Sequence, residues 1–304
     1  ALLDGLRFAE PGHEFSRAVG GIGAYGNSVG VATVGGEAVF DEAYRDNCLV
    51  NAMCVGLLPT ERLMRAKATG TGHSVVLYGA TTGRDGIGGA SVLASQELDD
   101  AAAEKRPSVQ IGDPFTGKKL IEASIELVQS GLVESLQDCG AAGLASSLSE
   151  MAVDFGIDVH LDRVPQREEG MEPWEIMISE SQERMVAVVR PGLLEAVQAV
   201  LDRWEVHHAV VGEVTESARL RAFYAGEVVG DIPARLLTDE CPRYAVERAP
   251  RPAPEPAPAP QAPPPARALR ERLASPHRRS RAWIYRRYDH RVGSRPVRRP
   301  GLDA

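Results

Sequence analysis

One carboxylate stands at a point in the sequence where a metal ion could bind. Asp138 ends a predicted strand and precedes a turn of small residues, Cys139–Gly143. A hard cation such as Mg²⁺ prefers carboxylate oxygen, so this position suits a magnesium ligand. The same carboxylate would also cap a helix predicted over 141–154, and the residues alone favour that interpretation. Cys139 has no basic residue nearby in the sequence, which predicts a small core side chain rather than a nucleophile.

A glycine-rich loop directly follows a strand predicted over 74–80. It begins with Thr82, Gly83 and Arg84. The backbone N–H groups of such a loop can bind a phosphate, and Arg84 could pair with it. An ordinary P-loop is excluded, because the loop lacks the Gly-Lys-Ser/Thr ending. The alternative is a tight structural turn in which Arg84 and Asp85 pair with each other.

A dense polar cluster, Ile178–Arg184, separates a predicted short helix from a strand predicted over 184–190. Polar side chains at the entrance of a strand can bind a ligand that carries hydroxyl and amide groups. The alternative is a solvated loop at a helix end. The adjacent His207 and His208 would point to opposite faces of a strand, so a metal site is not predicted there.

The glycines of Gly21–Gly26 fit the spacing of a dinucleotide-binding fingerprint. That fingerprint needs a buried strand before it and a helix after it. The preceding residues do not form a buried strand, which argues against a nicotinamide-dependent oxidoreductase. Phe15, Val19 and Ile22 instead recur at helical spacing, so we expect these glycines near a helix that packs closely on a neighbour.

Strands and helices alternate along the segments that must position these residues. Short apolar runs predict buried strands over 48–58, 74–80 and 184–190, and 209–233 predicts three short β segments. Two amphipathic helices are predicted, over 118–131 and 191–204. The first carries one broad apolar face and a glycine suited to end the helix, with these residues: Leu120, Ile121, Ile125, Leu127, Val128 and Gly131. The mixture indicates an α/β or α+β fold with mixed sheets.

Composition limits the classes of protein to which the chain can belong. It has 304 residues and is 43% hydrophobic, enough for a real core. No apolar run approaches the length of a membrane-spanning helix, and no secretory signal is visible. Four cysteines are too few for a disulfide scaffold and fit no zinc spacing. A cytoplasmic location is the simplest expectation.

The charge is distributed unevenly around a proline-rich segment. The net charge is −8, but twelve arginines from Arg267 onward face only three acidic residues. The acidic remainder argues against nucleic acid as a partner. Between these parts, 249–265 contains nine prolines and predicts an extended, exposed linker. Both ends of the chain suggest a fragment of a longer polypeptide.

The motifs together resemble the large synthetase subunit of phosphoribosylformylglycinamidine synthase in its short bacterial form. The resemblance covers nearly all of 1–241 and resumes at about 281. It rests on seven strings in order: YGNSVGVATVGGE (25–37), LVNAMCVG (49–56), TGRDGIGGAS (82–91), SVQIGDPF (108–115), LQDCGAAGL (136–144), REEGMEPWEIMISESQERM (167–185) and WIYRRYDHRVGS (283–294).

The resemblance implies an ATP-dependent ligase of purine synthesis. Such an enzyme converts formylglycinamide ribonucleotide to formylglycinamidine ribonucleotide. ATP phosphorylates the amide oxygen, and ammonia then displaces phosphate, with Mg²⁺ offsetting charge on the transferred group. The implied partners are a glutaminase subunit that supplies ammonia and a small bridging subunit, with no nucleic acid and no membrane.

The resemblance also assigns roles to single residues. Gln110, Glu180, Ser181 and Gln182 match substrate-binding residues of the family, and Asp138 matches a Mg²⁺ ligand. Thr82, Gly83 and Arg84 have no equally secure counterpart and remain candidates from their loop alone. Ala32 and Pro296 stand where the family usually has Pro and Thr, which casts little doubt on function.

The implied fold is that of aminoimidazole ribonucleotide synthetase, an α/β unit of two domains and the first half of a pseudo-repeat. The expected divisions are the end of a first N-type domain, its C-type domain, a linker and the start of a second N-type domain: 1–58, 59–244, 245–268 and 269–304. The family's catalytic histidine and its main Mg²⁺ glutamate would precede Ala1, so residues 1–304 are predicted to be inactive alone. The alternative is a non-catalytic half with a structural or regulatory role.

Overall fold

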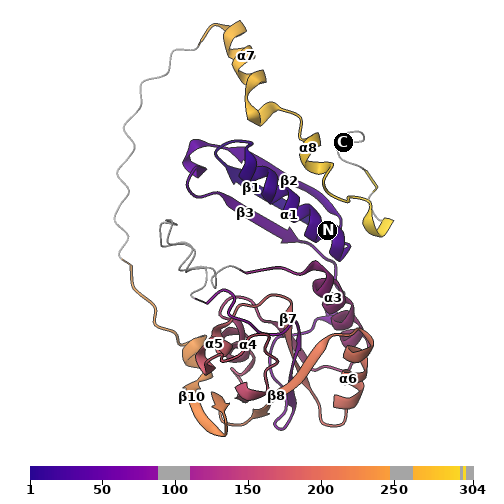
Figure 1. Ribbon diagram of the computed structural model, residues 1–304, viewed down its shortest axis with the longest axis vertical. Helices are drawn as coiled ribbons and strands as arrows, with labels where there is room; N and C mark the ends of the chain where they lie inside the picture. Colours follow the sequence, from indigo (N-terminus) through magenta and orange to yellow (C-terminus); the bar gives the residue numbers. More distant parts are fainter. Residues whose placement is uncertain (88–109, 247–262, 295–296, 299–304) are drawn as a thin grey trace. The chain divides into compact units, whose positions relative to one another are not determined.

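The computed structural model describes residues 1–87, 110–246, 263–294 and 297–298 (Figure 1). The chain divides into two compact units. The first combines residues 1–57 with 243–304, and the second is formed by 58–242. Within the described ranges, no helix is long and apolar enough to cross a membrane. Residues 88–91 of the glycine-rich loop and 249–262 of the proline-rich segment lie outside the described residues.

The first unit is built on a three-stranded sheet with the order β2-β1-β3. Its central strand β1 (Leu2–Phe8) pairs parallel with β2 (Thr33–Phe40) and antiparallel with β3 (Leu49–Cys54). Helix α1 (His13–Val29) connects β1 to β2 as a crossover, which parallel pairing requires. Two further helices follow later in the chain, α7 (Pro265–Ala274) and α8 (Ala282–Tyr285).

The aromatic core of this unit joins α1 to the sheet. Phe15 of α1 is fully buried and contacts Phe8 and Phe40 with ring centroids 5.1 Å apart in both cases. Ile284 and Tyr288, from the end of the chain, belong to the same core. The core therefore links segments more than 240 residues apart in the sequence.

The glycines of the dinucleotide-like motif lie inside α1, so the helical interpretation is confirmed. Gly23 and Gly26 are buried on its inner face. A Cβ added at Gly23 would lie 2.9 Å from the carbonyl oxygen of Arg287, and one at Gly26 would lie 3.1 Å from Leu2 Cδ1. The absence of a side chain at these glycines lets Arg287 and Leu2 approach the backbone of α1 closely. The glycine N–H groups lie within the helix, so they do not form a phosphate-binding loop.

The strand predicted over 48–58 is present, but the prediction that it is buried is wrong. A strand is present as β3, but all six of its residues are exposed. β3 lies at the sheet edge, where it pairs with β1. Apolar residues predict a strand from their β propensity, whereas burial depends on whether another element covers that strand. Among the described residues, none covers β3.

The proline-rich linker ends earlier than predicted. Helix α7 begins at Pro265, inside the range 249–265 expected to be extended. A proline is tolerated in the first turn of a helix, because its missing N–H would have no partner there. The residues that follow, Ala266–Ala274, are mostly strong helix formers.

Tyr288→Phe is expected to lower the free energy of unfolding of the first unit. The Tyr288 hydroxyl donates a hydrogen bond to the carboxylate of Asp4, which is 7% exposed. Losing a bond to a buried charged group costs about 1.5–3 kcal/mol. Chemical denaturation of wild type and variant measures this difference.

The effect of Tyr288→Phe should depend on pH. Burial raises the pKa of Asp4 above its ordinary 3.8. A carboxyl whose pKa is raised by folding contributes most stability when protonated, and that contribution is lost as the pH rises through its folded-state pKa. The Tyr288 hydrogen bond acts against this rise, because it favours the charged carboxylate and lowers the pKa of Asp4. The deficit of the variant should therefore be larger at pH 7, where more of Asp4 is charged, than at pH 4. An equal deficit at both pH values would contradict a charged Asp4 as the acceptor.

The second unit contains a seven-stranded mixed sheet with the order β10-β9-β6-β8-β4-β7-β5. β4 is an interior strand and pairs antiparallel with both β7 and β8, while β6 pairs parallel with β9. Its strands have these bounds: β4 (Ser74–Gly79), β5 (Ser135–Asp138), β6 (Gly156–His160), β7 (Arg184–Val189), β8 (His207–Thr215), β9 (Arg219–Tyr224) and β10 (Glu227–Pro233). The strands predicted over 74–80, 184–190 and 209–233 are confirmed.

Helices cover both faces of this sheet (Figure 1). α4 (Gly143–Met151) and α5 (Pro173–Ile178) lie on one face, and α3 (Pro114–Gln129) and α6 (Leu194–Arg203) on the other. Along β4, Val75 and Leu77 enter the first core while Val76 and Tyr78 enter the second. Burial on both sides explains why the strand is apolar throughout rather than alternating with polar residues.

The helix predicted over 118–131 begins earlier, at Pro114, because Asp113 caps it and Pro114 occupies its first turn. Gly131 follows the helix with a φ of 64°, a left-handed conformation suited to its predicted role. The predicted apolar face is too broad. Ile121 and Ile125 are exposed, since α3 contacts the sheet through a narrower stripe that includes Leu120, Ala123 and Leu127.

Candidate functional site

Strand pairing brings three polar segments to one edge of the second sheet. β7 runs antiparallel to β4, so Gly79 at the end of β4 lies opposite Arg184 at the start of β7. β5 is likewise antiparallel to β7, which places Asp138 opposite Met185. The loop after β4, the turn before β7 and the loop after β5 therefore meet, although they are far apart in the sequence.

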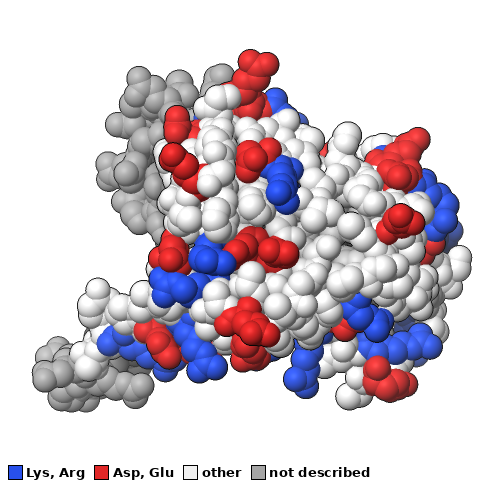
Figure 2. Space-filling model, turned by 90° about the horizontal axis from the view of Figure 1, so that it is seen from below, with Lys and Arg blue, Asp and Glu red and all other residues white. Residues whose placement is uncertain are grey.

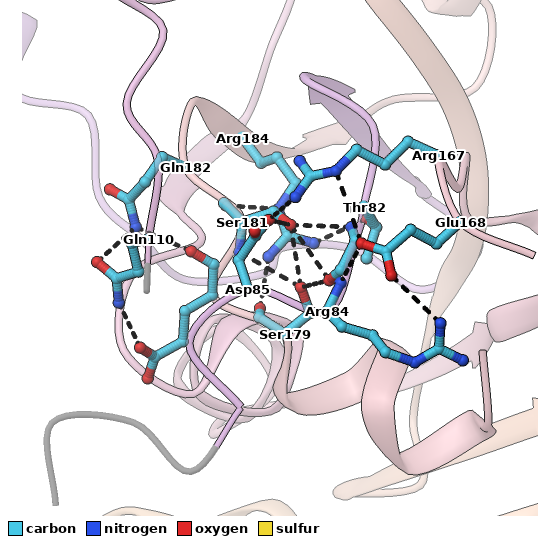
Figure 3. Close-up of polar contacts among 12 residues, drawn as sticks. Thr82, Arg84, Asp85, Gln110, Arg167, Glu168, Ser179, Ser181, Gln182 and Arg184 are labelled. Carbon is cyan, nitrogen blue, oxygen red and sulfur yellow. Dashed lines mark hydrogen bonds and ion pairs between the residues drawn. The ribbon is translucent and has the colours of Figure 1, made fainter. Parts of the chain in front are cut away.

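Gln110, Glu180 and Gln182 form one hydrogen-bonded group at this edge. The side-chain amide of Gln110 donates to Glu180 Oε2, and that of Gln182 donates to Gln110 Oε1 at 3.1 Å. The other carboxylate oxygen of Glu180 accepts the N–H of Ala142 at 2.9 Å. Gln110 and Gln182 lie side by side at one end of the polar network in Figure 3. The structure thus brings together three of the four residues expected to bind substrate.

Ser181 belongs to a second, buried layer behind that group. Its side chain is completely buried, and its hydroxyl lies 2.5 Å from Asp85 Oδ2 and accepts the N–H of Gly83 at 2.9 Å. Ser179 is equally buried and donates to the carbonyl oxygen of Gly83 at 2.6 Å. The alternative of a solvated loop over 178–184 is therefore wrong, because these hydroxyl groups bond to the β4 loop instead of water.

The glycine-rich loop is held by residues that the sequence interpretation did not pair with it. Arg84 bonds to Glu175 at 2.8 Å and to Glu168 at 3.2 Å, whereas Asp85 pairs with Arg167 (Figure 3). The predicted pair of Arg84 with Asp85 is wrong, since adjacent residues of this extended loop face different neighbours. The pKa of Glu175 is lowered, chiefly because Arg84 donates a hydrogen bond to its carboxylate.

The backbone N–H groups expected to bind phosphate already have partners in the chain. Thr82 N–H donates to the carbonyl oxygen of Pro165, Gly83 N–H to Ser181 Oγ, and Arg84 N–H to Glu168 Oε1, all at 2.8–2.9 Å. A phosphate at this loop would have to displace these contacts. Thr82, Gly83 and Arg84 remain a proposal as phosphate ligands, with the Arg84 guanidinium as the more exposed group.

Asp138 is exposed at the end of β5 and does not cap the following helix. The N-cap of α4 is Ala142, whose N–H donates to Glu180. Helix α4 also begins at Gly143, two residues later than predicted, because Ala142 has a left-handed φ of 57°. The capping interpretation is therefore wrong, and the Asp138 carboxylate is accessible to a cation.

Residue types around Asp138 are compatible with Mg²⁺ but do not form a complete protein cage. Among the described residues, no three His, Cys, Asp or Glu side chains are grouped to hold a metal ion. Mg²⁺ commonly binds through one or two carboxylates together with substrate phosphates and water, which a single exposed carboxylate can satisfy. Cys139 beside it is 4% exposed, and burial raises the pKa of its thiol, as expected for a core side chain.

Gly143→Ala is expected to destabilise the second unit by about 3 kcal/mol, from left-handed strain plus overpacking. Gly143 has a φ of 53°, and a Cβ there would overlap the carbonyl oxygen of Ser179. Gly192 is a matched control, since its φ is 87° but a Cβ would have nothing within 4 Å. Thermal unfolding should show a larger loss for Gly143→Ala than for Gly192→Ala. Equal losses would mean that the contact with Ser179 is unimportant.

Charges on the outer surface do not form a single basic region on the face shown in Figure 2. Lys and Arg side chains lie there among Asp and Glu side chains, with uncharged surface between them. Exposed ion pairs among the described residues include Lys67 with Asp154 and Arg219 with Asp231. Exposed pairs of this kind contribute little to stability.

Two family models match the chain and define the class of protein. The model for the AIR synthase related protein C-terminal domain matches residues 70–225, and that for the N-terminal domain matches 1–58. The chain therefore belongs to the AIR synthase-related family. The hydrogenase maturation protein HypE of E. coli shares this fold, with a TM-score of 0.57 at 20% identity over 75% of this chain and 71% of that protein.

Curated relatives within the family are subunits named PurL of phosphoribosylformylglycinamidine synthase. The relative from Anaeromyxobacter dehalogenans is 47% identical over the whole chain, and one from Carboxydothermus hydrogenoformans is 47% identical over 99% of it. The chain spans 42% of the length of each. The expected resemblance to this family is confirmed.

Solved structures of Thermotoga maritima PurL are similar to this chain. PurL complexed with FGAR has a TM-score of 0.75 and 39% identity over 84% of this chain and 42% of that one. PurL complexed with ATP has a TM-score of 0.70 and 37% identity over 89% and 43%. The structure titled PurLQS has a TM-score of 0.76 and 35% identity over 96% and 44%. The expected α/β fold of AIR synthetase type is confirmed.

Proposed function

We propose that the chain forms part of a ligase that makes formylglycinamidine ribonucleotide from formylglycinamide ribonucleotide, ATP and ammonia. The observation that carries this proposal is the convergence of Gln110, Glu180 and Gln182 on one edge of the sheet. All three match substrate-binding positions of the family, and a PurL relative binds FGAR. The group contains one carboxylate and two primary amides.

Such a group suits a ribonucleotide that carries hydroxyl and amide functions. The Glu180 carboxylate can accept hydrogen bonds from ribose hydroxyls or an amide N–H. The amides of Gln110 and Gln182 can each donate and accept. Because the carboxylate is already oriented by Ala142 N–H and by Gln110, little reorganisation is needed on binding. These residues would bind and orient substrate rather than transfer a proton.

ATP would activate the amide oxygen of the substrate. Phosphorylation converts that oxygen into a leaving group. Ammonia then adds to the amide carbon, and the C–O bond breaks to release phosphate, with ADP as the other product. Relatives complexed with ATP and with ADP support nucleotide use. Mg²⁺, when bound by Asp138 and phosphate oxygens, would neutralise charge on the transferred group.

The proposed partners are a glutaminase subunit, as the source of ammonia, and a small bridging subunit. The relative titled PurLQS supports assembly with other subunits. Ammonia made in one subunit and used in another favours a stable complex, since free ammonia is largely protonated near neutral pH. We also propose a cytoplasmic location, where ATP and nucleotide precursors are found.

The complete product of the reading frame that contains this chain tests the function. We expect it to form the amidine ribonucleotide when given formylglycinamide ribonucleotide, ATP, Mg²⁺ and ammonium, with one ADP released per amidine. The 304-residue chain alone should form none. Substrate binding without amidine formation by the complete product would favour the non-catalytic alternative. Failure to bind substrate would overturn the proposed function.

A further inference from the structure

Arg184 is a buried cation at the centre of the candidate site. It is the first residue of β7 and is 2% exposed. Its guanidinium donates to the carbonyl oxygens of Ser181 at 2.8 Å and Ser179 at 2.5 Å, and to Thr82 Oγ1 at 2.9 Å. None of these three bonds goes to a carboxylate. Burying a guanidinium without a direct ion pair has a large desolvation free energy. An apolar side chain would fill the same space without that free-energy cost, so stability alone does not explain an arginine here.

The bonds of Arg184 determine how residues 179–182 are arranged. The two carbonyl groups that it holds lie on either side of Glu180, and both are turned inward. The N–H of Glu180 donates to the Asp85 carbonyl oxygen at 2.8 Å, which fixes the middle of the same turn. The fixed turn leaves the side chains of Glu180 and Gln182 bonded to Gln110 on the other side.

Ser181 supports the same arrangement from within. Its hydroxyl donates a hydrogen bond to Asp85 and accepts one from the N–H of Gly83, so it acts as donor and as acceptor within the protein. Figure 3 shows Ser181, Asp85 and Arg184 together in the centre of the network, with Gln110 and Gln182 to one side. Of the three consecutive residues 180–182, Ser181 is fully buried, Glu180 is 5% exposed and Gln182 is half-buried, and only the outer two bond to Gln110.

We infer that Arg184 is a positioning residue for substrate binding: by holding the carbonyl groups of Ser179 and Ser181, it aims Glu180 and Gln182 at the ribonucleotide, while Ser181 acts behind them without touching it. This inference rests on the proposed function. A planar guanidinium can reach three acceptors in different directions, which the single ammonium of lysine does less well. The residue acts through other residues, so its loss should weaken binding without changing the chemical step.

Arg184→Lys and Arg184→Met test this role in the complete product of the reading frame. We expect the KM for formylglycinamide ribonucleotide to rise at least tenfold in Arg184→Met and by a smaller factor in Arg184→Lys. The kcat of each should stay within threefold of wild type, because an interaction that binds substrate and transition state equally affects KM alone. The KM for ATP serves as an internal reference and should change less than threefold.

Arg221→Met is the matched control. Arg221 lies on β9 of the same sheet and bonds to both carboxylate oxygens of Asp158, outside the site. Its loss should lower the thermal midpoint but leave KM unchanged, since partial unfolding removes active molecules without altering those that remain. Loss of kcat with an unchanged KM in the Arg184 variants would show a purely structural role and overturn the inference.

Substrate affinity by calorimetry separates this inference from the proposed function. If wild type binds formylglycinamide ribonucleotide and Arg184→Met binds it equally well, the inference is wrong while the function stands. If wild type does not bind it, both are wrong. Ser181→Ala gives a second readout. If the Ser181 hydroxyl contacts substrate, the variant should lose affinity for substrate. If the hydroxyl only supports the turn, as we infer, the thermal midpoint should fall and the affinity of the folded protein should change less than threefold.

Discussion

Glu180→Gln should lower kcat/KM for formylglycinamide ribonucleotide at least a hundredfold in the complete product of the reading frame. The substitution replaces one carboxylate oxygen by an NH₂ group. Both oxygens now accept N–H groups, from Gln110 and from Ala142, so one donor would face another. A lost partner for such a group costs about 1–3 kcal/mol, and 1.4 kcal/mol corresponds to a tenfold change. Steady-state kinetics at saturating ATP measures the effect.

Glu126→Gln is the matched control for that substitution. Glu126 also accepts hydrogen bonds from two side chains, Arg203 and Trp204, but it links α3 to α6 away from the site. Its replacement should leave kcat/KM within twofold. Glu180→Gln with near wild-type kcat/KM would remove Glu180 from substrate binding and with it the observation on which the function is proposed.

Asp138→Asn is expected to reduce turnover at least tenfold while the thermal midpoint stays unchanged. The carboxylate is exposed at the end of β5, and the N-cap position of the following helix is Ala142 rather than Asp138. Its replacement should therefore leave folding intact. A neutral amide is a much weaker ligand for Mg²⁺ than a carboxylate. Titration of turnover with Mg²⁺ should show half-saturation at a higher metal concentration in the variant.

Asp154→Asn provides the comparison for Asp138→Asn. Asp154 is an exposed carboxylate of the same unit that pairs with Lys67 at 2.8 Å. Its pKa is lowered by that lysine, so it is charged at neutral pH, as a metal ligand would have to be. Unchanged Mg²⁺ dependence is expected for this control. An identical response of both variants would assign the effect to surface charge rather than to metal binding.

Much of the second unit could be predicted from local sequence. Its central strands are apolar on both faces, and such runs signal burial wherever they occur in a chain. The glycine at 131 was predictable for a similar reason, because only the left-handed conformation ends the helix there. Errors occurred where burial depends on a distant element. Ile121 and Ile125 look like core residues in a helical pattern, but α3 contacts its sheet with a narrower stripe.

The site divides in the same way. Motif resemblance identified Gln110, Glu180 and Gln182, and the fold brings them together as expected. The resemblance gave no indication that Ser181 is buried. Side chains of successive residues before a strand point in alternate directions, and the sequence does not show whether Ser181 or its neighbours face the core. Arg167 was missed as a partner of Asp85, although it begins the matching string REEGMEPWEIM. The signal that could have identified Arg167 was its position as a basic residue in a recognised motif.

By itself, the sequence determined the family, several strands and helices of the second unit, and the residues proposed to bind a ribonucleotide. These properties follow from short-range patterns and from motifs whose residue types are required wherever the chain folds. Only the tertiary structure decided which polar groups pair. Arg84 with Glu175 and Arg184 with Thr82 join residues 91 and 102 positions apart. The antiparallel register of β4 and β7 places Arg184 beside the loop that carries Thr82, and the packing of α5 places Glu175 beside Arg84.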